Sequence, residues 1–203
     1  MTAKKRILIT MTLAMVLSTT SAWFHYQATG HISFSTLLHV ETEMHPPVFQ
    51  VFYDIGKGYR ERDAKSFAIH SPSQWQTISF AIPSNTLYGL RIDMINGPGV
   101  AALEETSLLA GSGETLFKMS PSAPIEGNQI AAMRFSAGRL EISTTPGADD
   151  PYIHLPFSPP LQSPALRDPA KHLVFALKIF AILFISLEIL FYFTSSHFIF
   201  PKK

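Results

Sequence analysis

The longest run of apolar positions lies in the last third of the chain. From Leu173 to Phe193 the sequence reads LVFALKIFAILFISLEILFYF, and its only clearly polar residues are Lys178, Ser186 and Glu188. A helix rises about 1.5 Å per residue, so this run reaches about 31 Å, the thickness of the hydrocarbon core of a bilayer. The pattern therefore predicts a transmembrane helix over residues 172–196.

A second apolar stretch runs from Ile7 to Trp23 and has two interpretations. Its basic start, its short apolar region and the small residues Thr20-Ser21-Ala22 are typical of a cleaved secretory signal peptide. Its length is also the lower limit for a spanning helix, and Trp23 would then lie at the membrane interface. The sequence therefore predicts either a signal peptide or a retained anchor over residues 7–24.

Between these segments, apolar and polar residues alternate in short runs. Phe49, Val51 and Tyr53 fall on one face of VFQVFYDI, and the turn Gly56-Lys57-Gly58 ends that run. Such alternation predicts β-strands with one buried face. Short strands at this spacing predict a mainly β fold, an antiparallel β-sandwich, for which we prefer a jelly-roll-like arrangement over an immunoglobulin-like one. Further strands are predicted at residues 31–40, 78–82, 88–92, 100–109, 129–135, 139–144 and 152–155.

Proline becomes dense after residue 155. The stretch PFSPPLQSPALRDP has few backbone donors, which favours an extended and semi-rigid linker over residues 156–171. Two transmembrane helices would then flank the sandwich. The expected parts are a cytoplasmic tail (1–6), the first apolar segment (7–24), the exported sandwich (25–155), the linker (156–171), the second apolar segment (172–196) and a basic tail (197–203).

Charge near the apolar segments predicts the orientation of the chain. Basic residues flank membrane segments on the cytoplasmic side. They precede the first segment and follow the second, so both termini are expected in the cytoplasm if the first segment is retained. The residues concerned are Lys4, Lys5, Arg6, Lys202 and Lys203.

The composition of the exported part limits its partners and its means of stabilisation. Residues 25–170 hold nine Lys and Arg against fourteen Asp and Glu, a formal balance of −5 that the overall value of +1 conceals. An acidic domain argues against a nucleic-acid partner. The chain has no cysteine, so a hydrophobic core and not a disulfide framework must stabilise this single domain.

Two motifs carry a resemblance to a known group of domains. They are FQVFYDIGKGYRERDAKSF (Phe49–Phe67) and LYGLRIDMINGPG (Leu87–Gly99), with GRLEIST as a weaker third. These motifs resemble the periplasmic β-sandwich domain associated with bacterial membrane glycosyltransferases of O-antigen and envelope polysaccharide assembly. This chain departs from that pattern at Met94, where the group has proline, and at Arg60 and Arg62, which interrupt an acidic segment.

The resemblance implies a location and a set of partners. The chain would lie in the bacterial inner membrane with its main domain in the periplasm. Its partners would be the lipid bilayer, a membrane protein of the glycosyltransferase or flippase type, and a saccharide. No cofactor is implied.

Six residues in and near these motifs are candidates for binding a glycan or a partner. Charged side chains can hydrogen-bond sugar hydroxyls, and aromatic side chains offer a flat apolar surface with a polar tip. An alternative interpretation is structural: Asp hydrogen-bonds turn backbones, alternate charged residues on one strand face pair with neighbouring strands, and aromatics fill the core. The candidates are Asp54, Tyr59, Trp75, Tyr88, Arg91 and Asp93.

Metal binding and catalysis find little support in the residue pattern. His39, Glu41, Glu43 and His45 alternate in HVETEMH, which is better explained as the solvated face of a strand than as a metal site. The chain has neither the Gly-x-Ser-x-Gly frame of a nucleophile elbow nor a phosphate-binding GxxxxGK[ST] loop. We therefore expect neither a metal nor an enzyme.

Glu188 is the most unusual residue of the second apolar segment. An intramembrane carboxyl group normally faces a protein interior or a cavity, or is protonated. We hypothesise that Glu188, together with Ser186, contacts another membrane subunit. The alternative is a protonated Glu188 that reaches toward the cytoplasmic headgroups, while Lys178 extends toward the opposite interface.

Three functional classes remain after these considerations. The preferred one is a non-enzymatic, membrane-anchored accessory protein that presents a periplasmic sandwich to envelope glycans or to a polysaccharide glycosyltransferase complex. The second is an enzyme that acts on lipid-linked or cell-wall saccharides, which requires two carboxyl groups about 5 to 10 Å apart in a cleft. The third is a purely structural spacer subunit.

Overall fold

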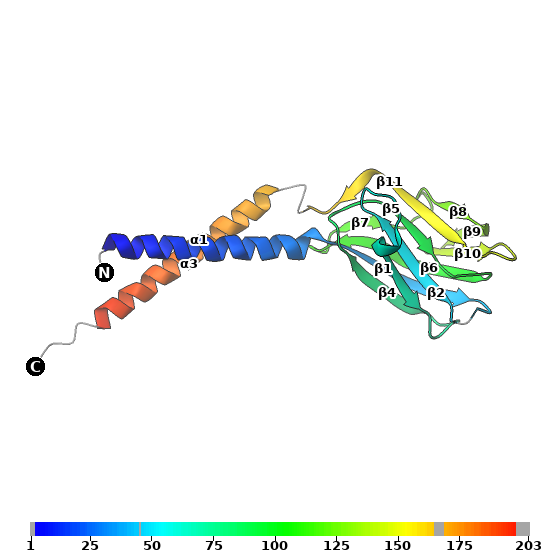
Figure 1. Cartoon of the computed structure of the whole chain (residues 1–203), viewed down its shortest axis with the longest axis horizontal. Helices are drawn as coiled ribbons and strands as arrows, with labels where there is room; N and C mark the ends of the chain where they lie inside the picture. The colour runs from blue at the N-terminus through cyan, green and yellow to red at the C-terminus, as the bar shows by residue number, and fades with distance from the viewer. Residues whose placement is uncertain (1–2, 45, 165–168, 198–203) are drawn as a thin grey trace, which may run out of the picture. The chain divides into compact units, whose positions relative to one another are not determined.

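A computed structural model of the chain describes residues 3–44, 46–164 and 169–197 (Figure 1). The chain divides into two compact units. Residues 30–166 form a β-sheet unit, and residues 1–29 with 167–203 form a helical unit. His45 lies outside the described residues, so the structure does not test the part of the predicted HVETEMH face that depends on it.

One of the two sheets is six-stranded, with the order β4-β1-β6-β10-β9 and β7 paired to β6. All of its pairings are antiparallel. We call it sheet A. Its strands are β1 (Ile32–Glu41), β4 (Gln76–Ile82), β6 (Val100–Ala110), β7 (Thr115–Lys118), β9 (Ile130–Ser136) and β10 (Arg139–Thr144).

The other sheet, sheet B, is five-stranded with the order β3-β2-β5-β11-β8. It is also antiparallel throughout. A short 3-10 helix, η1 (Glu61–Asp63), follows the turn after β2. The strands are β2 (Val48–Asp54), β3 (Ala64–Ala68), β5 (Thr86–Asp93), β8 (Glu126–Asn128) and β11 (Tyr152–Gln162).

A single apolar core lies between the sheets, which makes the unit sandwich-like. In β1 every second residue from Ile32 to Val40 is buried, as the pleat of a strand requires. The core combines side chains from both sheets, among them Phe34, Leu38, Leu103, Ile142, Phe49, Val51, Leu90, Ile92, Ile153 and Leu155. Burial of this apolar surface is the main stabilising contribution in a chain without disulfides.

Aromatic pairs connect the two sheets at opposite sides of the core. Phe67 of β3 lies 5.7 Å from Phe80 of β4, and Phe117 of β7 lies 5.2 Å from Phe157 of β11, measured between ring centroids. These separations are within the preferred range for aromatic pairs. The pairs therefore fix the two sheets against each other near their edges.

The two places where the chain joins the sandwich lie at the same end of it. Ile32, the first residue of β1, pairs with Ile82, the last residue of β4. Gln162, the last residue of β11, pairs with Thr86, the first residue of β5. Ile82 and Thr86 are joined by a short turn, whose Ser84 donates its backbone N–H to Ile82. Both junctions therefore lie beside this turn, and residues 94–99 lie at the opposite end.

The helical unit holds two long helices, α1 (Ala3–Gly30) and α3 (Pro169–His197). Each contains a window that is long and apolar enough to cross a membrane, Ile7–Phe24 and Leu173–Tyr192. Most large apolar side chains of these windows are not covered by other parts of the chain and are exposed, including Leu8, Met15, Ile182 and Leu190. The first window lies near the N-terminus, where a signal sequence would have the same properties.

The sequence-based strand predictions hold for eight strands, and the mainly β, two-sheet antiparallel fold is confirmed. The alternation pattern missed β3, β7 and β8, which are the three shortest strands. The expected linker over residues 156–171 differs from the structure at both ends. The strand β11 continues through Pro156 to Gln162, with its pairing to β5 interrupted between Pro156 and Leu161, and α3 begins at Pro169.

Candidate functional site

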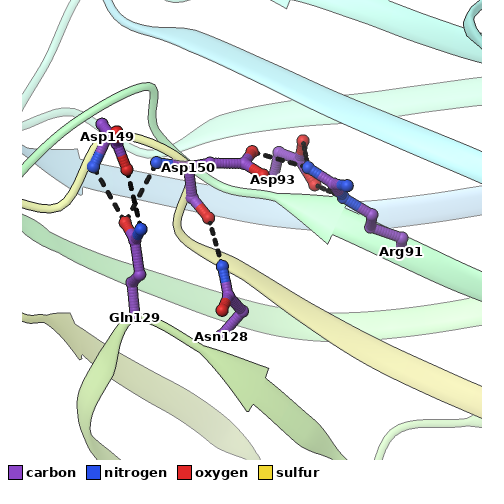
Figure 2. Close-up of polar contacts among 6 residues, drawn as sticks. All are labelled: Arg91, Asp93, Asn128, Gln129, Asp149 and Asp150. Atoms are coloured by element: carbon purple, nitrogen blue, oxygen red, sulfur yellow. Dashed lines mark hydrogen bonds and ion pairs between the residues drawn. The ribbon is translucent and has the colours of Figure 1, made fainter.

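Arg91 is the centre of a polar cluster on the outer face of sheet B. Its Nε and Nη2 atoms donate to the two carboxylate oxygens of Asp93 at 2.8 and 2.9 Å. Nη2 also donates to Oδ1 of Asp150 at 2.6 Å. Figure 2 shows the guanidinium and the two carboxylates together, although Arg91 and Asp150 lie far apart in the sequence. Bidentate pairs of this kind are among the strongest hydrogen-bonded contacts in proteins.

Aromatic side chains hold the same guanidinium from the sides. The Cζ atom of Arg91 lies 3.9 Å from the ring centroid of Tyr152 and 5.1 Å from that of Phe52. These distances are typical of cation–π contacts. Because three strands, β2, β5 and β11, contribute to it, the guanidinium is fixed in one position.

Burial shifts the pKa of the Asp93 carboxyl group. Its side chain is only 16% exposed, and this desolvation raises the pKa of its carboxyl group, while the hydrogen bonds and the charge of Arg91 act in the opposite direction. The net direction is upward, because burial, together with the negative charges of Asp150 and Glu61, outweighs the ion pair. Asp150 is more exposed, at 56%, so its contact with Arg91 is better screened by solvent.

Two amide side chains position the loop that carries Asp150. Gln129 accepts the backbone N–H groups of Asp149 and Asp150 at 2.8 and 3.0 Å, and its own amide donates to the Asp149 carboxylate at 2.7 Å. Asn128 donates to the backbone carbonyl of Asp150 at 2.8 Å. Figure 2 shows Gln129 and Asn128 reaching toward this loop from one side. The loop is therefore held before any ligand is bound.

Asp54 has the structural role that its position before a glycine turn allows. Its Oδ1 atom accepts the backbone N–H groups of Gly56, Lys57 and Gly58 at 2.8 to 2.9 Å. Gly56 and Gly58 have φ of 94° and 71°, which other residues adopt only with strain. Oδ1 is thus occupied by the turn, and the structural interpretation of Asp54 is the better one.

Tyr59 packs on sheet B at Gly89 of β5, a position that has no side chain. A Cβ atom on Gly89 would lie 2.5 Å from the Tyr59 hydroxyl oxygen, so only glycine leaves room for the tyrosine. The Tyr59 ring meets His154 edge-on at 5.4 Å between centroids. Burial, followed by the charge of Asp54, raises the pKa of the Tyr59 hydroxyl. Tyr59 is therefore packed against the sheet rather than presented to solvent.

Tyr88 and Trp75 are the two exposed aromatic candidates. Tyr88 is 45% exposed and lies against Gly56, near the turn that Asp54 holds. Trp75 is 41% exposed and precedes β4 at the edge of sheet A. The two aromatics belong to different sheets, so the structure does not bring the six candidates into one site.

Trp75 has neighbours that the sequence did not associate with it. The ring of His39 lies 5.2 Å from the Trp75 ring, and the Cζ atom of Arg139 lies 4.9 Å from its centroid. Arg139 also donates from Nε to Glu104 at 2.6 Å. We call these four side chains, on the outer face of sheet A, the Trp75 platform.

A small cavity of about 120 Å³ lies beside the Arg91 cluster. Its lining includes Asp93, Asp149 and Asp150. Oxygens of Asp93 and Asp150 accept from the same Nη2 at 2.9 and 2.6 Å, so they lie within 5.5 Å of each other. Glycoside hydrolysis needs two carboxyl groups about 5 to 10 Å apart, so these oxygens lie at or below the lower end of that range. The Arg91 nitrogen, however, lies between the two oxygens, where the bond to be cleaved would have to lie.

The membrane candidates Ser186 and Glu188 point in different directions. Ser186 is exposed on α3, whereas Glu188 is half-buried and its Oε1 atom has almost no exposed surface. The predicted contact of both residues with another subunit stays a prediction. Among the described residues, no three His, Asp or Glu side chains are grouped so that they would hold a metal ion.

Several residues of these clusters were not predicted from the sequence. Asp150, Tyr152 and Gln129 join Arg91 from distant strands and loops, and His39 and Arg139 join Trp75. Alternation assigns a residue to a face of a strand but does not give the order of the strands. Comparison with known proteins gives no match: no family model, no curated protein and no solved structure matches this chain.

Proposed function

We propose that this chain is a non-catalytic accessory protein of the bacterial inner membrane. Two transmembrane helices anchor it, both termini lie in the cytoplasm, and a periplasmic sandwich binds an envelope saccharide. The observation that carries the anchoring is that the chain holds two helices long and apolar enough to span a bilayer, one before the first strand and one after the last. A domain that lies between two spanning helices in the sequence is exposed on one side of the bilayer.

The hydroxyl groups of α1 support a membrane location. Thr12, Thr19 and Thr20 are exposed, yet each donates to a backbone carbonyl one turn earlier, at 2.8 to 2.9 Å. In a bilayer, polar groups must be satisfied internally because no water is present. The basic residues before α1 and at the C-terminus then favour cytoplasmic ends.

The sandwich itself we assign to the jelly-roll-like class. The chain passes repeatedly between the sheets: β1, β4 and β6 belong to sheet A, whereas β2, β5 and β11 belong to sheet B. Such alternation is expected of double-sheet Greek-key folds. Folds of this kind have many functions, so the assignment by itself implies no activity.

The Trp75 platform is our proposed saccharide-binding surface. An exposed indole offers a flat apolar face, and the adjoining His39, Arg139 and Glu104 offer donors and acceptors for hydroxyl groups. The Arg91 cluster is less suited to this role, because Arg91 already binds Asp93 and Asp150 and stacks on Tyr152. We assign that cluster to holding β5, β11 and the loop before β11 together.

A non-catalytic role agrees with the geometry of the Asp93 and Asp150 carboxylates. Oxygens of Asp93 and Asp150 lie within 5.5 Å of each other, but Arg91 donates to both and occupies the space between them. The suggested partner, a glycosyltransferase or flippase in the same membrane, rests on the sequence resemblance alone. Co-purification from mild detergent tests that partner.

A glycan-binding experiment tests the proposed function. The full chain, reconstituted in lipid nanodiscs, is applied to an array of bacterial O-antigen and capsule oligosaccharides. We expect binding that Trp75→Ala weakens by at least about tenfold, the loss expected of a central aromatic contact. Tyr88→Ala is the matched control, since it removes an equally exposed aromatic from the other sheet.

Three outcomes would overturn the proposal. If the wild-type chain binds none of these glycans, the sandwich is a spacer and not a binding module. If Tyr88→Ala abolishes binding and Trp75→Ala does not, the binding face is on sheet B. Release of sugar from the same oligosaccharides on incubation would contradict the non-catalytic assignment.

A further inference from the structure

Three small side chains on one side of α1 are buried, whereas its large apolar side chains are exposed. Thr10, Ala14 and Ser18 are 0%, 0% and 3% exposed. The neighbouring Leu13 and Met15 are 44% and 63% exposed. A helix of a soluble protein buries its large apolar residues, so this reversed pattern is that of a helix whose small face contacts another helix and whose large side chains face lipid.

The spacing of the buried residues identifies the geometry of the contact. Thr10, Ala14 and Ser18 follow one another at every fourth position, so they form one ridge of the helix. Small residues in such a ridge allow two helix backbones to approach closely. Among the described residues the helical unit holds two helices, α1 and α3, so we infer that α3 covers this ridge.

A matching ridge exists on α3. From residue 175 to residue 188 the half-buried positions are 175, 176, 179, 180, 183, 184, 187 and 188, and those between them are exposed. This is again a repeat of four. Glu188 belongs to the ridge, and its buried Oε1 atom lies within the helical unit.

The two ridges are in register when the helices are antiparallel. The chain enters the sandwich from α1 and leaves it toward α3 at the same end, so two spans of one bilayer must be antiparallel. Aligning the midpoints of the apolar windows sets Thr10 opposite Glu188, Ala14 opposite Phe184, and Ser18 opposite Phe180. Each of these α3 positions is half-buried. The hydroxyl of Thr10 and the carboxyl of Glu188 are therefore at the same depth.

The site at which a signal peptide would be cut belongs to a regular helix. The small residues Thr20, Ser21 and Ala22 lie within α1, which continues without interruption to Gly30. Ser21 and Ala22 are half-buried. Proteolytic nicking is favoured at irregular backbone, and the backbone of these residues is regular helix.

We propose that α1 is retained in the mature protein as a transmembrane helix that docks antiparallel on α3, with the ridge of Thr10, Ala14 and Ser18 against the ridge that carries Glu188. The docking partner of the intramembrane carboxyl group is thus α1 of the same chain and not a separate subunit. The inference rests on the proposed anchoring by two transmembrane helices and goes beyond it, because two helices that span the same bilayer need not contact each other.

Cysteine pairs test the docking directly, because the chain has no cysteine of its own. The full chain carries Thr10→Cys with Glu188→Cys, or Ala14→Cys with Phe184→Cys, and a protease site in the exposed turn at residues 111–113. Isolated bacterial membranes are oxidised or treated with a short bismaleimide, and the turn is then cut. The matched control, Leu13→Cys with Ile185→Cys, places exposed residues at the same depth.

We expect the two halves to remain joined in both test pairs and to separate in the control. N-terminal sequencing of the wild-type chain should find the residues before Ala22 present. A chain that begins after Ala22, equal linking of control and test pairs, or linking only between two copies would overturn the inference. If carbonate extracts the whole chain from membranes, the proposed anchoring itself fails, which is a distinguishable result.

Discussion

Replacing Arg91 with methionine removes the guanidinium while keeping most of the stem that packs between Phe52 and Tyr152. The change leaves the carboxylate of Asp93, only 16% exposed, without its ion pair. Breaking a buried ion pair from one side costs about 3–5 kcal/mol, whereas exposed pairs contribute about 0–1 kcal/mol. Because the Arg91 side chain is 24% exposed, we expect a loss of about 2–4 kcal/mol in the free energy of unfolding.

The same variant should show a changed dependence of stability on pH. Burial already raises the pKa of Asp93, and without Arg91 nothing opposes it, so the pKa in the folded state rises further. A carboxyl group with a raised folded-state pKa stabilises the fold below its unfolded pKa, about 4, and this contribution is lost as pH rises through the folded pKa. The deficit of Arg91→Met should therefore be smaller at pH 4 than at pH 7.

Thermal and urea unfolding of purified residues 30–166, followed by circular dichroism, measure both effects. A loss of this size lowers Tm by about 10 °C in a domain of this length. Arg139→Met is the control, since its ion pair with Glu104 is more exposed and should cost at most about 1 kcal/mol. Equal stability of Arg91→Met and wild type, or a deficit that does not change with pH, would refute the assignment of Arg91 as a structural centre.

Three further substitutions test local features of the structure. Asp54→Ala removes the acceptor of three turn amides and should lower the free energy of unfolding by about 1–2 kcal/mol. Asp54→Asn keeps an acceptor oxygen and should lose less, and urea unfolding measures both variants. Gly89→Ala places a Cβ 2.5 Å from the Tyr59 hydroxyl and 3.1 Å from the Leu155 carbonyl, and should lower stability by about 1–3 kcal/mol; an unchanged midpoint contradicts the tight contact. Phe34→Ala empties the centre of the core and should cost about 3–5 kcal/mol by the same measurement.

Alternation along the sequence predicted the long strands because each has one face in a continuous core. In β1, Leu38 and Val40 are buried and His39 is not, as the pattern HVETEMH indicated. The short strands were missed because they have no row of buried residues that would produce this alternation. In β3, for example, the stretch AKSFA has no fully buried residue, and its pairing with β2 is what makes it a strand.

The clusters were less predictable than the strands. The sequence placed Arg91 and Asp93 on one face of a strand, and it suggested that each would pair with a neighbouring strand. They pair with each other, and Arg91 also pairs with Asp150 in the loop before the neighbouring strand β11. Strand order depends on contacts across the whole domain, so local periodicity contains no information on it.

The aromatic candidates show the same limit. Tyr59, Tyr88 and Trp75 looked equivalent in the sequence as sources of a flat apolar surface. In the structure Tyr59 packs on Gly89, whereas Tyr88 and Trp75 are more than 40% exposed. Only the glycine opposite Tyr59 explains the difference, and that pairing depends on the folded turn after β2.

The most direct test of the account is the topology of the chain in the membrane. Single cysteines introduced as Thr2→Cys, Ser112→Cys and Lys203→Cys in this cysteine-free chain are exposed to a membrane-impermeant maleimide in bacterial spheroplasts. The account predicts labelling of Ser112→Cys in intact spheroplasts, and of the two terminal variants only after permeabilisation. Labelling of either terminus from outside, or protection of Ser112→Cys, would contradict a periplasmic sandwich held by two transmembrane helices.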